Sequence, residues 1–212
     1  MPSLPALYAL CDRDVCEGAG WSLTDFAMAC VEGGARLLQV RDKRASSARL
    51  LATVFEILDR VRSTGTLVIV NDRADVARIA RAAGVHVGQD DLPPARVRSV
   101  VGEAAVVGLS THTHAQIDRA VPEPISYLAI GPVFATTTKE TGYSAVGLMR
   151  VGEAAAAART RGLPVVGIGG ITLERAPSVL AAGARSVAVA SDLLVGQNPA
   201  RRVREYVDRF ER

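Results

Sequence analysis

Three basic side chains of the sequence are suited to binding a polyphosphate. Arg41 and Lys43 follow the apolar run that ends at Val40, and Lys139 follows a run of three threonines. Guanidinium and ammonium groups donate charge-assisted hydrogen bonds to phosphate oxygens. If the fold brings these two segments together, the three cations predict a site for a strongly anionic ligand such as a diphosphate.

Two acidic side chains at equivalent places are candidate metal ligands. Asp72 follows the apolar run that ends at Val70, and Asp91 follows the run that ends at Val87. Mg²⁺ prefers carboxylate, water and phosphate oxygens, so an ion held by both carboxylates would also bridge to a diphosphate. A single aspartate after a strand more often caps a helix or forms a turn. Two on neighbouring strands, beside Asn71, leave the metal site and the turn as equal alternatives.

A second anion site is indicated further along the chain. The pairs Gly169-Gly170 and Ala190-Ser191 each end an apolar run. In barrel proteins, backbone N–H groups at such places often bind a phosphate, whereas paired glycines are as common in a plain tight turn. Taken together, the three groups predict a site for two phosphorylated ligands. A diphosphate with Mg²⁺ would occupy one side and a monophosphate the other.

The apolar runs that precede these side chains are predicted to be parallel strands. They are nearly continuous in Leu, Ile, Val and Ala, which is typical of strands buried on both faces. We expect strands over residues 7–11, 36–40, 66–70, 85–87, 105–109, 126–130, 164–168 and 186–190. Amphipathic helices are expected over residues 23–31, 46–62, 74–83, 94–101, 114–121, 149–160, 173–182 and 199–210. Glycines suited to ending a helix precede several strands, at Gly34, Gly84, Gly162 and Gly183.

This alternation favours a closed (β/α)₈ TIM barrel, with residues 1–212 forming a single domain. The competing fold is a doubly wound open sheet. That fold more often carries a G-x-G-x-x-G turn after its first strand, which residues 11–20 lack. In a barrel the carboxyl ends of the strands form the functional face, so the polar groups described above are expected to converge there.

The composition excludes several classes of protein. The chain has 212 residues, of which 49% are apolar and 22% charged, as in globular proteins and unlike disordered ones. A net charge of +3 without a basic run does not favour a nucleic-acid partner. No apolar stretch is long enough to span a membrane, and no signal peptide is evident. We therefore expect a cytoplasmic protein with small-molecule substrates, compatible with a homo-oligomer as with a monomer.

A zinc site is disfavoured. His112 and His114 have a spacing that can hold a metal ion, but His86 is the only other histidine. His86 stands between Val85 and Val87 and is interpreted as a packed strand residue. The three cysteines lack the paired spacing of a zinc site and suit a reducing compartment.

In their order along the chain, these motifs resemble the thiamine phosphate synthase family, whose members are (β/α)₈ barrels. The matching segments are QVRDK, IVNDRADVA, GVHVGQDDLP, GLSTH, IGPVFATTTK, VVGIGGI and GARSVAVAS, which span residues 39–191. The resemblance implies a transferase that joins (hydroxymethyl)pyrimidine diphosphate to hydroxyethylthiazole phosphate. Pyrophosphate would be released and thiamine monophosphate formed. It also implies a dissociative route, in which the pyrimidine methylene becomes a carbocation before the thiazole nitrogen attacks.

The resemblance implies roles for individual residues. Contacts with the pyrimidine diphosphate are implied for Gln39, Val40, Arg41, Asp42, Lys43, Asn71, Ser110 and Lys139, with Arg41, Ser110 and Lys139 as catalytic groups. Contacts with the thiazole phosphate are implied for Thr136, Thr137, Thr138, Gly169, Ala190 and Ser191, and Mg²⁺ ligation for Asp72 and Asp91. The sequence departs from the family pattern at two positions. Family members often have Leu or Tyr in place of Val40, and they commonly have Val in place of Ala190.

Two other functions remain open at the level of the sequence. A thiazole tautomerase on the same barrel would isomerise a thiazole carboxylate phosphate by proton transfer. It would need a general base such as a histidine but no site for a diphosphate and a metal ion. A catalytically silent barrel that only binds thiazole phosphate is the second alternative. The sequence disfavours it, because none of the expected diphosphate contacts is missing. Formation of thiamine phosphate from both substrates distinguishes the three.

We predict that Lys139→Ala lowers kcat by at least about tenfold, because negative charge grows on the leaving diphosphate in the transition state. The KM for thiazole phosphate should stay close to that of the unaltered enzyme. Steady-state kinetics with both substrates measures the two quantities. A variant with normal kcat and only a raised KM for the thiazole would contradict this role.

Overall fold

A computed structural model describes residues 4–136 and 142–211, and the described strands close into a single parallel barrel. The strands are β1 (Leu7–Asp12), β2 (Leu37–Arg41), β3 (Leu67–Asn71), β4 (Gly84–Val87), β5 (Val106–Thr111), β6 (Tyr127–Ile130), β7 (Val165–Ile168) and β8 (Ser186–Val189). Each strand pairs with the next, and β8 pairs with β1. The predicted (β/α)₈ barrel is confirmed.

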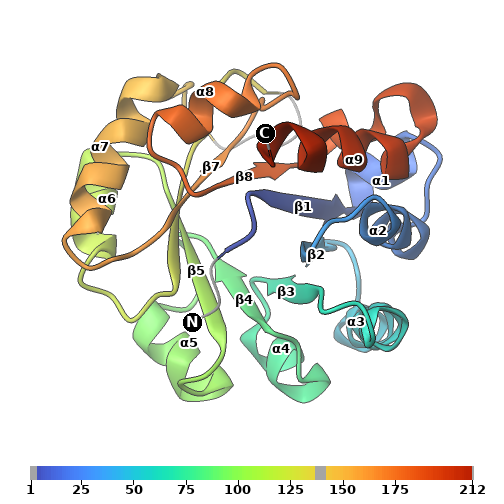
Figure 1. Ribbon diagram of the computed structural model, residues 1–212. Helices are drawn as coiled ribbons and strands as arrows, with labels where there is room; N and C mark the ends of the chain where they lie inside the picture. The colour runs from blue at the N-terminus through green and yellow to red at the C-terminus, as the bar shows by residue number, and fades with distance from the viewer. Residues whose placement is uncertain (1–3, 137–141, 212) are drawn as a thin grey trace.

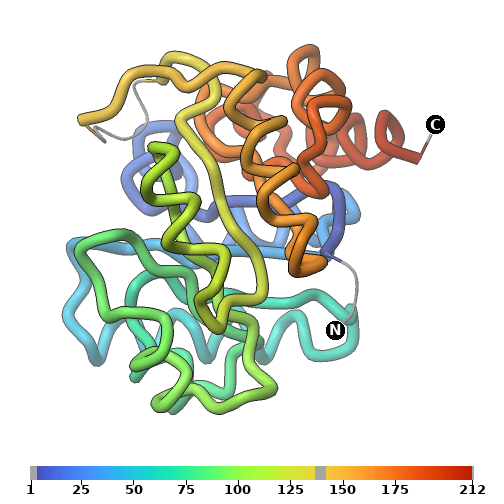
Figure 2. Tube along the Cα trace, turned by 90° about the vertical axis from the view of Figure 1, so that its left-hand side faces the viewer, coloured from blue at the N-terminus to red at the C-terminus, as the bar shows by residue number. Residues whose placement is uncertain are grey.

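Helices surround the strands, as Figure 1 shows. They are α1 (Arg13–Gly18), α2 (Leu23–Glu32), α3 (Ser47–Val61), α4 (Ala74–Ala80), α5 (Pro94–Val101), α6 (His114–Ala120), α7 (Gly147–Arg159), α8 (Ala176–Ala181), the 3₁₀ helix η1 (Ser191–Gln197) and α9 (Pro199–Phe210). In the perpendicular view of Figure 2, the helices between β5 and β8 stack along one side of the barrel.

Two short elements, α1 and η1, are absent from the elements expected from the sequence. Neither shows a helical hydrophobic period, because α1 spans six residues and η1 contains a kink at Val195 and Gly196. A cap rather than a pattern starts α1: Asp12 Oδ1 accepts hydrogen bonds from the backbone N–H groups of Asp14 and Val15. Both elements lie directly after a strand, where they shape the functional face.

Two layers of buried side chains hold the barrel. The outer layer lies between the strands and the helices and includes Val40, Val68 and Val85. The inner layer fills the barrel itself and consists of Leu4, Tyr8, Leu37, Ile69, Tyr127, Ala129, Val166 and Ala188. Because successive strand residues face opposite ways, β1, β2, β3, β6, β7 and β8 each contribute to both layers.

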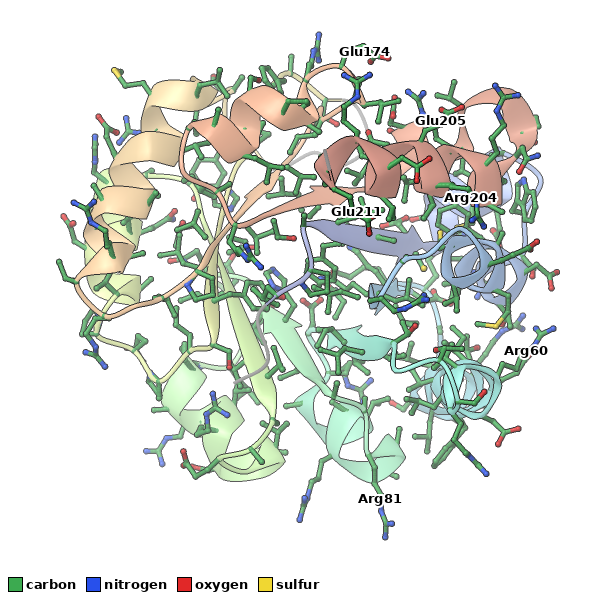
Figure 3. The ribbon with its side chains drawn as sticks, in the orientation of Figure 1. Arg60, Arg81, Glu174, Arg204, Glu205 and Glu211 are labelled. Carbon is green, nitrogen blue, oxygen red and sulfur yellow. The ribbon has the colours of Figure 1, made fainter. Side chains whose placement is uncertain are left out.

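Charged side chains lie mainly on the outside of the helical ring. Figure 3 shows Arg60, Arg81 and Glu174 projecting away from the barrel. Many such groups form ion pairs along a helix, as Arg60 does with Glu56. Among the described residues, no helix combines the length and the apolar character needed to cross a membrane.

One glycine has a different role from the one expected. Gly34, Gly162 and Gly183 adopt positive φ angles after helices, as predicted, but Gly84 lies within β4. Helix α4 instead ends on Arg81, which takes the left-handed conformation at φ 55°. A Cβ atom on Gly84 would lie 1.9 Å from the carbonyl oxygen of Val106. Gly84 therefore permits the close approach of β4 and β5.

We predict that Gly84→Ala lowers the free energy of unfolding by at least about 2 kcal/mol, because β5 backbone occupies the space of the new methyl group. Gly18→Ala is the matched control, since a Cβ atom there meets nothing within 4 Å and Gly18 is helical. The control should be neutral or gain up to about 1 kcal/mol. Urea unfolding of both variants measures the difference, and equal stabilities would contradict the assigned role of Gly84.

Candidate active site

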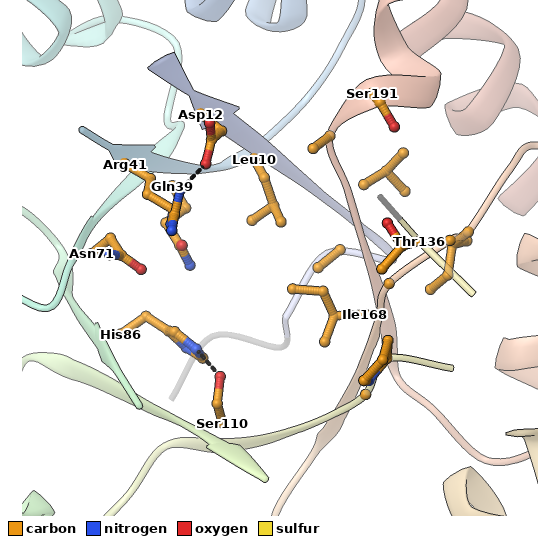
Figure 4. A pocket seen from close by; sticks show the side chains of 18 of the residues that line it. Leu10, Asp12, Gln39, Arg41, Asn71, His86, Ser110, Thr136, Ile168 and Ser191 are labelled. Carbon is orange, nitrogen blue, oxygen red and sulfur yellow. Dashed lines mark hydrogen bonds and ion pairs between the residues drawn. The ribbon is translucent and has the colours of Figure 1, made fainter. Parts of the chain in front are cut away.

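A cavity of about 840 Å³ opens at the carboxyl ends of the strands. Figure 4 shows polar side chains pointing into it from several strands. The cavity is lined by Gln39, Arg41, Lys43, Asn71, Asp72, Asp91, Ser110, Thr136, Gly169, Ala190 and Ser191, all of which the sequence motifs single out. A volume of this size is in the range of small-molecule sites and has room for two small ligands.

The side formed by β2, β3 and β4 carries both cations and acids. Arg41, at the end of β2, forms an ion pair with Asp12 at the end of β1. Lys43 forms an ion pair with Asp72. These pairs hold the cationic groups beside the cavity without removing their N–H donors, since a guanidinium has five and an ammonium three.

Asp72 and Asp91 lie next to one another on this side. The pKa of Asp72 is raised, mainly by burial and further by the adjoining carboxyl group of Asp91, whereas Lys43 lowers it. Asp72 adopts a left-handed conformation at φ 60°, and its backbone N–H donates to the carbonyl oxygen of His86 at 2.7 Å. Asp91 Oδ2 accepts from the N–H of Gly88 at 2.8 Å. Two adjoining, partly buried carboxylates repel each other, and a divalent cation would relieve that repulsion.

The opposite side, formed by the ends of β6, β7 and β8, is built from backbone. Gly169 and Gly170 have φ angles of 95° and 62°. A Cβ atom on Gly169 would lie 2.5 Å from Pro132, and one on Gly170 would lie 2.5 Å from the carbonyl oxygen of Ala135. The two glycines therefore allow the segments after β6 and β7 to pack closely, and Thr136 and Ser191 complete this side.

A largely buried carboxylate, 10% exposed, fixes the element that carries Ser191. Asp192 Oδ2 accepts from Nε and Nη2 of Arg202, at 3.1 and 2.9 Å, and from the hydroxyl group of Tyr206 at 2.6 Å. It also accepts from the backbone N–H of Leu173 at 3.2 Å. These contacts join η1 to helix α9 and to the segment after β7, so α9 helps to position this side of the cavity.

Some residues that the sequence assigned to the site lie elsewhere. Val40 is fully buried in the outer layer, because the side chains of Gln39 and Arg41 take the inward positions. Asp42 accepts hydrogen bonds from Arg13 and from the backbone after it, and these lower its pKa although burial opposes them. Neither Val40 nor Asp42 lines the cavity. Thr137, Thr138 and Lys139 are outside the described residues.

Other residues of the cavity were missed or interpreted differently. Asp12 directly follows the first apolar run, a position that predicts a place on the functional face. His86 is packed, as expected, but it faces the cavity, and its Nε2 lies 2.8 Å from Ser110 Oγ. The alternation with Val85 and Val87 on the other face of β4 was the available signal.

His112 stacks on Tyr143 with ring centroids 4.1 Å apart. No cluster of three metal-ligating side chains occurs in residues 4–136 and 142–211.

Comparison with known proteins agrees with this geometry. A family model described as "Thiamine monophosphate synthase" matches residues 7–193. The chain belongs to the thiamine monophosphate synthase family. It is therefore an enzyme of the transferase class and of thiamine biosynthesis.

Relatives in this family resemble the chain over nearly its whole length. The thiamine-phosphate synthase of Koribacter versatilis is 45% identical over 207 residues, which cover 96% of this chain and 95% of that protein. That of Myxococcus xanthus is 40% identical and covers 99% and 96%. The solved structure of thiamine phosphate pyrophosphorylase from Pyrococcus furiosus superposes with a TM-score of 0.85 at 26% identity, covering 97% of this chain and 95% of that one.

We predict that Arg202→Met lowers the free energy of unfolding by about 3 kcal/mol, because the largely buried Asp192 loses its charge partner. The matched control is Arg201→Met on the same helix, which breaks only an exposed pair with Glu205 and should cost less than about 1 kcal/mol. Thermal or urea unfolding checks both values. Similar stabilities of the two variants would show that the Asp192 contact does not hold α9.

Proposed function

We propose that this enzyme joins (hydroxymethyl)pyrimidine diphosphate to hydroxyethylthiazole phosphate, forming thiamine monophosphate and pyrophosphate. The observation that carries the proposal is the two-sided cavity. Arg41, Lys43, Asp72 and Asp91 gather on one side, and the backbone of Gly169, Gly170 and Ser191 forms the other. Membership of the thiamine monophosphate synthase family supports the same reaction.

The two carboxylates fit a magnesium ion. Mg²⁺ is usually bound through one or two carboxylates, with water and substrate phosphate completing its shell. Asp72 and Asp91 supply that number, and burial together with the neighbouring carboxyl group of Asp91 raises the pKa of Asp72 although Lys43 opposes this. When bound, Mg²⁺ would offset negative charge on the diphosphate. Asp72 and Asp91 are the residues that would hold it.

The cationic side chains would stabilise the departing diphosphate. Arg41 is fixed by its ion pair with Asp12 before any ligand arrives, so little reorganisation is needed as charge develops on the leaving group. Lys43 would bind phosphate oxygens from the neighbouring position. Lys139 has the same role in this proposal, on the basis of the sequence motif.

Neutral polar side chains would orient the pyrimidine. Gln39, Asn71 and Ser110 line the cavity from β2, β3 and β5. Thr136, Gly169, Ala190 and Ser191 would hold the thiazole phosphate on the opposite side, which points the thiazole nitrogen at the pyrimidine methylene. Holding both reactants in one cavity converts a bimolecular encounter into a positioned one. Once the diphosphate leaves, an amino-substituted pyrimidine delocalises the resulting positive charge until the nitrogen attacks.

The tautomerase alternative is disfavoured by the β2–β4 side of the cavity. An enzyme that isomerises a thiazole carboxylate phosphate binds no diphosphate. Arg41, Lys43 and the two carboxylates would then have no ligand to bind. His86 and His112 do line the cavity. Both engage protein groups, since His86 contacts Tyr127 and Ser110, and His112 Nδ1 hydrogen bonds to the carbonyl oxygen of Gly131.

We predict that Asp72→Ala and Asp91→Ala each lower thiamine phosphate formation by at least about 100-fold, because loss of one carboxylate weakens metal binding and leaves the diphosphate charge poorly neutralised. Excess Mg²⁺ should restore part of the activity. The measurement is pyrophosphate release against Mg²⁺ concentration for each folded variant.

The control for this experiment is Asp75→Ala. Asp75 also follows β3 but pairs with Arg73 on the surface, outside the cavity lining, so its removal should leave the rate unchanged. Full activity of the unaltered enzyme in chelator would remove the metal ion from the reaction. Isomerisation of the thiazole carboxylate phosphate without pyrophosphate release would establish the tautomerase instead.

A further inference from the structure

A continuous chain of hydrogen bonds crosses the barrel beneath the cavity. Gln39 Nε2 donates to the hydroxyl group of Tyr8 at 2.8 Å, and the hydroxyl groups of Tyr8 and Tyr127 are 3.1 Å apart. The Tyr127 hydroxyl lies 2.8 Å from His86 Nδ1, and His86 Nε2 lies 2.8 Å from Ser110 Oγ. Both ends of the chain, Gln39 and Ser110, line the cavity (Figure 4).

The three middle members are deeply buried and packed in place. Tyr8 is 1% exposed, Tyr127 is 0% and His86 is 7%. The His86 and Tyr127 rings stack with centroids 5.6 Å apart. Gly108 makes room for Tyr127, because a Cβ atom there would lie 2.1 Å from the tyrosine ring. Water cannot readily replace a lost partner in such a position, so each link of the chain constrains the next.

The direction of every hydrogen bond follows from the first. The Gln39 amide nitrogen can only donate, so the Tyr8 hydroxyl oxygen accepts from it. Among the described residues, Tyr127 is the one acceptor within reach of the buried Tyr8 proton, so Tyr8 donates to Tyr127. Burial raises the pKa of both tyrosines, which keeps both hydroxyl protons in place. Tyr127 then donates to His86 Nδ1.

The far end of the chain follows by the same reasoning. With Nδ1 accepting, the neutral imidazole of His86 carries its proton on Nε2 and donates to Ser110 Oγ. The Ser110 hydroxyl proton is left for a ligand acceptor. At the other end, the amide nitrogen of Gln39 is bound to Tyr8, so its carbonyl oxygen can accept a hydrogen bond from a ligand.

We propose that this chain fixes the hydrogen-bonding polarity of the cavity floor, and that Tyr127 is a positioning residue that makes Ser110 a donor while Gln39 is an acceptor. The proposal deepens the proposed function and rests on it for the identity of the ligand. An aminopyrimidine offers the complementary pair, an amino group that donates and a ring nitrogen that accepts. The corresponding 4-oxopyrimidine carries an N–H and a carbonyl group in their place and would oppose both residues.

The tautomer of His86 tests the chain without any substrate. In protein with ¹⁵N-labelled histidine, the imidazole of His86 should be protonated on Nε2 and unprotonated on Nδ1. The protein has three histidines, so the His112→Gln and His114→Gln variants identify which signals belong to His86. Tyr127→Phe should give a mixture of tautomers. Tyr8→Phe should keep the Nε2–H form, since Tyr127 can still donate to Nδ1. An Nδ1–H tautomer in the unaltered protein would reverse the chain and overturn the proposal.

Kinetics then test what the chain does for the ligand. Tyr127→Phe should lower kcat/KM for the aminopyrimidine diphosphate about tenfold or more, while the KM for thiazole phosphate changes less than about twofold. The preference for the aminopyrimidine over its 4-oxo analogue should shrink by a similar factor. Thr111→Val is the matched control, because it removes a buried hydroxyl group that lies outside the hydrogen-bond chain, on β5 next to Ser110. It should leave that preference unchanged.

The outcomes separate the two proposals. An Nε2–H tautomer in a protein that forms no thiamine phosphate would overturn the proposed function and leave the chain standing. Thiamine phosphate formation with an unchanged preference in Tyr127→Phe would overturn the role of the chain and leave the function standing. Should Tyr127→Phe fail to fold, the tautomer of His86 in the unaltered protein still tests the direction of the hydrogen bonds. Tyr8→Phe then tests the Gln39 end by kinetics, because it removes the partner that orients the Gln39 amide while Tyr127 continues to donate to His86.

Discussion

In a closed parallel barrel, successive residues of each strand point alternately toward the barrel axis and toward the helices, and the functional groups described above depend on this alternation. On β2 it turns Gln39 and Arg41 inward and Val40 outward. On β4 it turns His86 inward between two valines of the outer layer. A shift of one residue in strand pairing would exchange these sets and bury charges among the helices.

The same alternation brings opposite charges together at one rim. Arg41 meets Asp12 from the adjacent strand, and Lys43 meets Asp72 from the other side. The rim thus holds cations at a moderate cost, because each is balanced within the protein before an anion arrives. Across the cavity, Arg202 forms an ion pair with Asp192, so the acid next to Ser191 does not leave an uncompensated negative charge facing the cavity.

The sequence was sufficient for the architecture and for much of the rim, because apolar runs and the polar residues after them are local features. It predicted the barrel, and it singled out Arg41, Lys43, Asp72 and Asp91, which the structure places on one side of one cavity. It was not sufficient where a role depends on contacts between distant segments. Gly84 was interpreted as a helix end because its close approach to Val106 involves the neighbouring strand.

The buried polar residues show the same limit. Tyr8, Tyr127 and His86 lie in apolar runs and look like core residues, which they are. Only their meeting inside the barrel, across up to 119 positions of sequence, joins them by hydrogen bonds. The sequence pattern does not predict such contacts between distant residues. Residues at strand ends can be predicted, because they directly follow an apolar run.

The contact between Asp192 and helix α9 has a consequence for the order in which the protein becomes competent during synthesis. The first seven strands and their helices can leave the ribosome and begin to pack while η1 still lacks Arg202 and Tyr206. Asp192 would then be a carboxylate without its main donors, and the segment that carries Ser191 would not be held. Because α9 also packs against α2, the last helix of the barrel closes the ring next to one of the first. The half of the cavity that contains Ser191 is therefore completed late, by residues that do not line it.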